Sequence, residues 1–196
     1  MPLEIAQAIT ASRLTELRAL LAPLLQTGLP LTLEIGSGHG HYLTAYAEAH
    51  PAKFCIGIDL IGDRLDRSAR KSNRAALTNI AWLHAEVSLF LEALPAETRL
   101  AEVFLLFSDP WPKRRHWKNR VVQPEFLTLL ASRAEAGARF CFRTDHAEYF
   151  DYAQKIAVAH ADWQVAEEPW PFELATVFQE RAENGHQSFI ARRSCR

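Results

Sequence analysis

The sequence is poor in cysteine and methionine, with three and one among its 196 residues. The cysteines, Cys55, Cys141 and Cys195, are odd in number and form neither a CxxC pair nor a spacing typical of metal ligands. Cys55 and Cys141 lie in apolar stretches, so we expect them to be buried thiols. This usage favours a reducing, cytoplasmic environment over an oxidising one.

Long apolar runs and an excess of positive charge are also missing. No apolar run approaches the roughly 20 residues that a membrane-spanning helix requires, and residues 1–26 lack the pattern of a signal peptide. The formal net charge is −1, which excludes a protein that binds nucleic acid through a basic surface over its whole length. We therefore expect a soluble protein without membrane contact, in which any polyanion site is a local patch.

No linker, repeat or low-complexity tract divides the chain. Hydrophobic residues make up 48% of it, which suits one domain over 1–196, with a helical segment at 1–28 and a core at 29–196. Hydrophobic periodicity predicts helices over 10–25, 42–50, 63–76, 89–94, 124–133 and 149–160, with Gly137 marking the end of the fifth. Strands are predicted over 31–35, 54–60, 79–84, 102–107, 139–143, 162–165 and 187–192. This alternation predicts an α/β, Rossmann-like, doubly wound and mostly parallel sheet with helices on both faces.

A glycine-rich loop follows the first predicted strand. Glu34 precedes Gly36, Gly38 and Gly40, a spacing that differs from the dinucleotide fingerprint GxGxxG because a third glycine would have to occupy position 41. It resembles instead the cofactor loop of class I S-adenosylmethionine-dependent methyltransferases. Asp59 lies at the end of the second strand, where an acidic residue accepts hydrogen bonds from ribose hydroxyls in Rossmann-like sheets.

Glu86 follows the third predicted strand and has two interpretations. Its carboxylate can accept a hydrogen bond from the amino group of an adenine, or it can cap the helix that comes after it. The glycine loop and Asp59 together indicate a nucleoside cofactor, whereas a glycine turn alone would say little.

The segment after the fourth predicted strand carries the most specific signal. Residues 107–116 read FSDPWPKRRH, so Asp109 stands at a strand end, followed by two prolines that flank Trp111. Five cations fall within eight residues: Lys113, Arg114, Arg115, Lys118 and Arg120. A charge run is often only a solvated face, but Trp111 and Trp117 interleave with it, and indoles among cations favour RNA contact by stacking and phosphate binding.

The run from Phe107 to Lys118 resembles the hallmark of bacterial tRNA (guanine-N7)-methyltransferases, and the resemblance extends over nearly all of the chain from Leu31 onward. It implies S-adenosyl-L-methionine as cofactor, tRNA as partner and methylation of guanine N7 as the activity. By position, it implies cofactor binding by Glu34, Asp59 and Glu86 and a catalytic centre at Asp109. It implies substrate contacts by Lys113, by Asp145 of the Thr144-Asp145 pair, and by the element that contains Thr176 and Gln179.

Three features depart from the family pattern. Gln179 replaces a glutamate, Asn119 interrupts the basic run, and the chain begins close to its first helix without the basic extension of longer members. Two alternatives stay open: a divergent class I methyltransferase acting on another RNA or a small nucleobase compound, and a non-catalytic RNA- or nucleotide-binding paralogue. The histidines show no evident metal geometry, so no metal is expected, and no heptad or apolar stripe distinguishes a monomer from a homodimer.

Overall fold

The computed structural model describes residues 3–174 and 185–195. Its strands are β1 (Leu31–Ile35), β2 (Phe54–Asp59), β3 (Ile80–His84), β4 (Leu100–Leu106), β5 (Ala134–Thr144), β6 (Trp163–Ala166) and β7 (Gln187–Arg193). Its α-helices are α1 (Leu3–Leu24), α2 (His41–Ala49), α3 (Gly62–Arg74), α4 (Val87–Ala93), α5 (Pro124–Arg133) and α6 (Ala147–Ala159). Two 3₁₀ helices, η1 (Leu25–Thr27) and η2 (Arg114–Asn119), complete the described elements.

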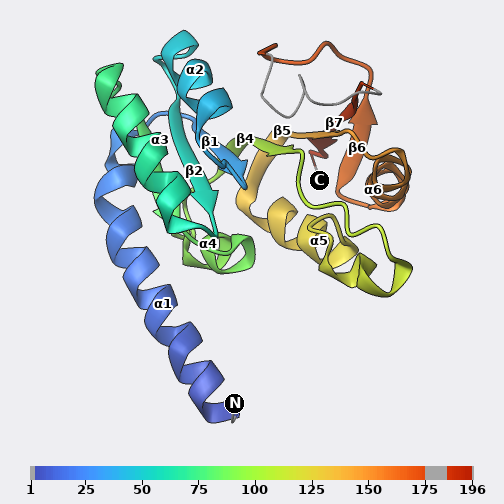
Figure 1. The fold of residues 1–196 in the computed structure, drawn as a ribbon, viewed down its shortest axis with the longest axis horizontal. Coiled ribbons are helices and arrows are strands. Elements are labelled where there is room, and N and C mark those ends of the chain that lie inside the picture. The colour runs from blue at the N-terminus through green and yellow to red at the C-terminus, as the bar shows by residue number, and fades with distance from the viewer. Residues whose placement is uncertain (1–2, 175–184, 196) are drawn as a thin grey trace.

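The seven strands form one sheet in the order β3-β2-β1-β4-β5-β7-β6 (Figure 1). The pairs β1–β2, β1–β4, β2–β3 and β4–β5 are parallel, and β7 runs antiparallel to β5 and β6. The order reverses at β1, from which the chain winds first towards β3 and later towards β6. The carboxyl ends of β1 and β4 therefore lie side by side at the switch point where such sheets bind ligands. The prediction of a Rossmann-like, mostly parallel sheet is confirmed.

Alternate residues of the central strands face two different helix layers. Leu31, Leu33 and Ile35 face the larger apolar core, to which α1, α4, α5 and α6 contribute. Cys55 and Phe104 face a smaller core with residues of α2, against which the segment 170–174 packs. Burial on both faces explains why these strands are almost continuously apolar.

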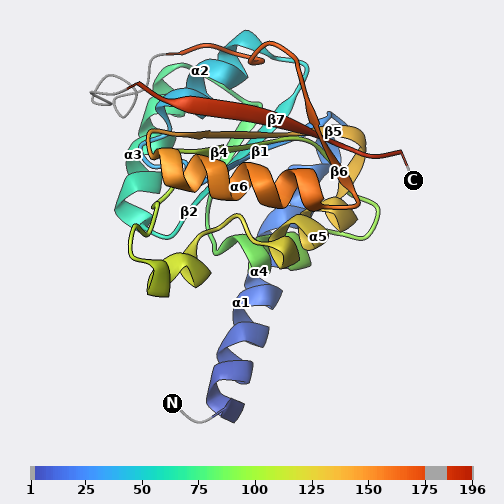
Figure 2. The ribbon, with the colours of Figure 1, turned by 90° about the vertical axis from the view of Figure 1, so that its right-hand side faces the viewer.

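Helix α1 is longer than predicted and reaches beyond the body of the protein. Leu17 and Leu21 are buried, but the amino-terminal half projects outward, leaving Leu3 and Ile5 exposed (Figure 2). Within the described residues, no helix is long and apolar enough to cross a lipid bilayer. Cys55 and Cys141 are buried free thiols, as expected.

Most predicted bounds agree with the structure to within a few residues, but the assignment of Gly137 is wrong. Helix α5 ends at Arg133, and the chain passes directly into β5 at Ala134. Gly137 lies within β5 with φ of 79°, near the position where the pairing of β5 with β4 shifts register. Glycine adopts this conformation without steric cost, so Gly137 permits an irregularity in the strand and does not end the helix.

Candidate functional site

The glycine loop connects β1 to α2 and is held at the end of β2. The backbone N–H groups of Gly36 and Ser37 both donate to Ile58 O at 2.9 Å. Gly36, Gly38 and Gly40 all have positive φ, between 55° and 70°. A Cβ on Gly36 or Gly38 would meet no atom within 4 Å, whereas one on Gly40 would lie 2.5 Å from Trp82 and 2.7 Å from Ser68. The first two glycines thus expose backbone to open space, and the third packs the loop against α3.

Asp59 braces this loop from the end of β2. Its Oδ2 accepts a hydrogen bond from Gly38 N at 2.8 Å, and its Oδ1 accepts one from Ile61 N at 2.9 Å. The residue is 5% exposed. Because each carboxylate oxygen has a second lone pair, Asp59 can brace the loop and still accept a ligand hydroxyl. Two predicted cofactor-binding residues, Gly38 of the loop and Asp59 of β2, are therefore in direct contact.

Glu34 is a buried carboxyl without a complete set of partners. It is 4% exposed, and its Oε2 has no hydrogen-bond partner among the described residues. The pKa of Glu34 is raised to about 8, chiefly by burial and to a smaller extent by the charge of Asp59, against the opposing effects of a backbone hydrogen bond from Leu43 and the charge of Lys71. Since an unsatisfied buried polar atom is costly, this carboxyl is a strong candidate for contact with a ligand.

Glu86 caps α4, so the second of its two interpretations describes the structure. Its Oε2 accepts from Ser88 N at 2.8 Å and from Leu89 N at 3.1 Å, which satisfies two free N–H groups of the first helical turn. The side chain is exposed at the end of β3. Cofactor contact by Glu86 stays a prediction.

Asp109 lies in an exposed loop between two strained residues. Phe107 and Trp111 have φ of 49° and 44°, a region that bulky side chains rarely adopt. The Asp109 carboxylate is exposed and forms no hydrogen bond or ion pair with any residue that the structure describes. Such strain is concentrated at functional sites. The two prolines of this loop indicated a turn in the sequence, but the positive φ values of Phe107 and Trp111 could not be predicted from it.

Arg120 was predicted to contact RNA, and the structure contradicts this prediction. The residue is 2% exposed, and its Nε donates to Pro110 O at 2.7 Å. Its guanidinium lies 4.3 Å from the Trp117 ring centroid and 4.9 Å from that of Tyr149, and it pairs with Glu148 at 3.7 Å. Arg120 is therefore an internal support for the Asp109 loop, because its planar cation stacks between aromatic rings while bonding to the backbone.

Trp117 is also less available than predicted. It packs edge-on against Tyr152 at 5.3 Å, and its Nε1 atom is buried. Four other predicted RNA contacts, Lys113, Arg114, Arg115 and Lys118, are exposed on or beside η2. Four cations of the motif are therefore on the surface, and one, Arg120, is buried and supports the loop.

Asp145 lines a cavity of about 430 Å³ beyond the end of β5, together with His146, Glu148 and His186. The cavity lies at the same carboxyl edge of the sheet as the Asp109 loop, because β4 and β5 are parallel neighbours. Thr176 and Gln179 lie outside the described residues.

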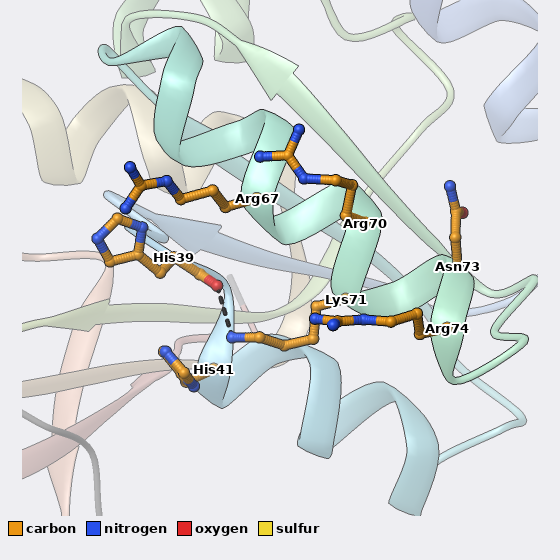
Figure 3. Close-up of a pocket in the computed structure, with 7 residues that line it drawn as sticks. All are labelled: His39, His41, Arg67, Arg70, Lys71, Asn73 and Arg74. Carbon is orange, nitrogen blue, oxygen red and sulfur yellow. Dashed lines mark hydrogen bonds between the residues drawn. The ribbon is translucent and has the colours of Figure 1, made fainter.

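One group of residues at the glycine loop was missed by the sequence analysis. A cavity of about 570 Å³ lies between this loop and α3, and Figure 3 shows its lining side chains. They are His39, His41, Arg67, Arg70, Lys71, Asn73 and Arg74. The signal was present in the helical spacing of positions 67, 70, 71 and 74, which places four cations on adjoining faces of one helix.

Comparison with known proteins places this geometry in a family. A family model described as "Putative methyltransferase" matches residues 29–190. A tRNA (guanine-N(7)-)-methyltransferase from Azorhizobium caulinodans is 34% identical over 151 residues, covering 72% of this chain and 65% of the relative. Proteins with the same name from Listeria monocytogenes and Thermus thermophilus are 35% and 31% identical, covering 63% and 72% of this chain. The chain spans 58% and 46% of their respective lengths.

Solved structures share the fold at lower identity. An antibiotic-related methyltransferase superposes with a TM-score of 0.60 at 19% identity, covering 89% of this chain and 92% of the other. An rRNA methylase from Streptococcus thermophilus gives 0.60 at 11% identity, covering 90% and 93%. These structures support a class I methyltransferase fold, and the sequence match over residues 29–190 shows that the chain belongs to this methyltransferase family.

Proposed function

We propose that this protein transfers a methyl group from S-adenosyl-L-methionine to N7 of a guanine in tRNA, in the cytoplasm. The observation that carries the proposal is the adjacency of two loops. Ile35 pairs with Leu105, so the glycine loop after β1 and the Asp109 loop after β4 leave neighbouring strands at the same edge. The similarity to relatives named tRNA (guanine-N(7)-)-methyltransferase supports the choice of substrate.

The residues on β1 and β2 fit the cofactor. Gly36 and Gly38 present bare backbone to open space, and Asp59 retains lone pairs for ribose hydroxyls. Glu34 supplies a buried oxygen without a partner among the described residues, suited to a hydrogen-bond donor or a cationic group. When bound, the cofactor supplies a methyl group on a positively charged sulfur.

The residues after β4 and β5 suit a guanine acceptor. Guanine N7 has an in-plane lone pair and no proton to remove, so the reaction requires positioning more than a strong general base. The Asp109 carboxylate can accept from guanine N–H groups and favour the positive charge that develops on the ring. Asp145 and Lys113 would hold the substrate at the rim, and the exposed cations of η2 would bind phosphates.

The direct test is to incubate the purified chain with S-adenosyl-L-methionine and bulk tRNA and identify the methylated nucleoside by mass spectrometry. We expect 7-methylguanosine. A different methylated nucleoside would show that the enzyme methylates another nucleobase or another atom of guanine. The absence of any product, despite cofactor binding, would favour a non-catalytic RNA-binding protein.

Asp109→Ala tests the role of the catalytic centre. We expect turnover to fall by about 10³-fold or more, because positioning and electrostatic stabilisation would be lost together. Cofactor affinity and the thermal midpoint should change little, since Asp109 is exposed and unpaired within the described part of the chain. Asp151→Ala, another exposed aspartate, is the matched control. Near-normal turnover in Asp109→Ala would refute the assignment.

A further inference from the structure

Among the described residues, the cavity between the glycine loop and α3 is lined by cations, histidines and Asn73, and by no acidic residue. Arg67, Arg70 and Arg74 are exposed, and none of them forms an ion pair within the described part of the chain. The nearest acidic residues of the same helix, Asp63 and Asp66, lie towards its first turn and do not line the cavity. Three unneutralised guanidinium groups around one cavity favour an anionic ligand.

Close packing beneath the cavity fixes this arrangement. Ser68 and Ser72 are buried, and Ser68 Oγ donates to Gly38 O at 3.2 Å. Small side chains at these two positions let α3 lie directly on the glycine loop, so the flanking positions 67 and 71 are held at the cavity rim. Lys71 reaches across and donates to His39 O at 2.8 Å, as Figure 3 shows.

The electrostatics of the cavity agree with an anion site. Burial lowers the pKa of Lys71, and the neighbouring charge of Arg74 lowers it further. Burial also lowers the pKa of His41, with Lys71 and His39 adding to the effect. These groups repel one another in the free protein, and a bound anion would relieve that repulsion.

The location indicates a polymer and not a small anion. The arginines that line the cavity are exposed to solvent, and the cavity volume of about 570 Å³ is larger than one phosphate group requires. Figures 1 and 2 show α3 and the loop that contains η2 at the same end of the molecule, on opposite sides of β1 and β4. A strand that entered the proposed acceptor site would therefore have cations on both flanks.

We infer that this α3 cavity binds backbone phosphates of the RNA substrate, as a second docking site separate from η2. The inference rests on the proposed function for the identity of the polyanion. Arginine binds phosphate by paired N–H donors, and the cofactor itself carries no phosphate, so the ligand of this cavity is distinct from the occupant of the glycine loop.

The test compares Arg70→Gln/Arg74→Gln with the wild-type chain. Glutamine keeps the helix propensity and removes charge, and neither arginine forms a described side-chain bond. Arg13→Gln/Arg18→Gln is the matched control, because it removes two exposed arginines of α1 that do not line the cavity. Binding of labelled bulk tRNA is measured across salt concentrations, and S-adenosyl-L-methionine affinity is measured by calorimetry.

For the α3 variant we expect tRNA affinity to fall by about tenfold and the slope of log affinity against log salt to flatten by about one to two. Cofactor affinity should stay at the wild-type value, which also verifies folding. Equal tRNA affinity and salt slope in the α3 variant and the control would overturn the inference.

The outcomes separate this inference from the proposed function. A loss of tRNA binding in the α3 variant, with no 7-methylguanosine formed by the wild type, would retain the docking site and refute the proposed reaction. Product formation that the α3 substitutions leave unchanged, with unchanged tRNA affinity, would refute the docking site alone. Failure of the wild-type chain to bind tRNA would refute both.

Discussion

Two buried glutamates on neighbouring strands have opposite surroundings. Glu102 of β4 is 1% exposed; its Oε2 accepts hydrogen bonds from Lys53 Nζ at 3.0 Å and from the Tyr46 hydroxyl, and its Oε1 forms an ion pair with Arg139 at 2.5 Å. Glu34 of β1 is 4% exposed, and one of its oxygens has no partner among the described residues. Because Thr32 pairs with Glu102 and Glu34 with Phe104, both carboxyls face the same helix layer.

The difference follows the direction of the sheet. Glu102 lies towards the amino ends of the strands, where its cations come from β5 and from the residue before β2, and it links three segments of the chain. Glu34 lies at the carboxyl edge beside the glycine loop. A buried carboxylate that is ion-paired with cations, as Glu102 is with Lys53 and Arg139, contributes to the fold, whereas a buried carboxyl without such a pair among the described residues implies a ligand.

The largest expected difference between the two glutamates is in their effect on the free energy of unfolding. Glu102→Gln should lower the free energy of unfolding by about 3 to 4 kcal/mol, because it leaves Lys53 and Arg139 without their counter-charge. Glu34→Gln should leave stability at neutral pH equal or higher, since it removes a carboxyl that burial disfavours in its charged form. Urea denaturation without cofactor measures both. Equal losses in the two variants would contradict the distinction.

The second effect is the pH dependence of stability. The pKa of Glu34 is raised to about 8 in the fold, above its ordinary value of 4.5, so the stability it contributes is present below pH 4.5 and is lost as the pH rises through 8. Between about pH 5.5 and about pH 7.5 the wild type should lose about 2 to 3 kcal/mol relative to Glu34→Gln. Denaturation curves of the two proteins across this range measure the difference. A constant difference would show that Glu34 is not a titrating group of the fold.

The smallest effect concerns cofactor binding. If the cofactor favours the ionised carboxyl of Glu34, binding near pH 7 should release about one proton, because the free carboxyl is mostly protonated there. Calorimetry in buffers of different ionisation enthalpy measures this release. Glu34→Gln should abolish it and weaken cofactor binding by about tenfold, or ~1.4 kcal/mol. Glu102→Gln, where it remains folded, should leave proton release unchanged, and release by the Glu34 variant would exclude this role.

Local patterns predicted most of the framework. The bounds of β1 and of α5 agree with the prediction at both ends, because a buried apolar strand and a helix with proline at its first position have strong local signals. The glycine loop and Asp59 lie at strand ends as predicted, since parallel strands bring their carboxyl ends to one edge. Arg120 could not be separated from the other cations of its motif, because its burial depends on Tyr149 and Tyr152 from a distant helix.

The sequence by itself determined the order of elements along the chain and the residue types at the strand ends, because periodicity and turn residues act over short distances. Only the tertiary structure decided which charges are paired. It enclosed Arg120 among aromatic rings, gave Glu102 three partners, left Glu34 with an unpartnered oxygen among the described residues, and assembled the cations of α3 around one cavity. The physical reason is that the burial and pairing of a charge depend on segments far apart in the chain, which only the packed fold brings together.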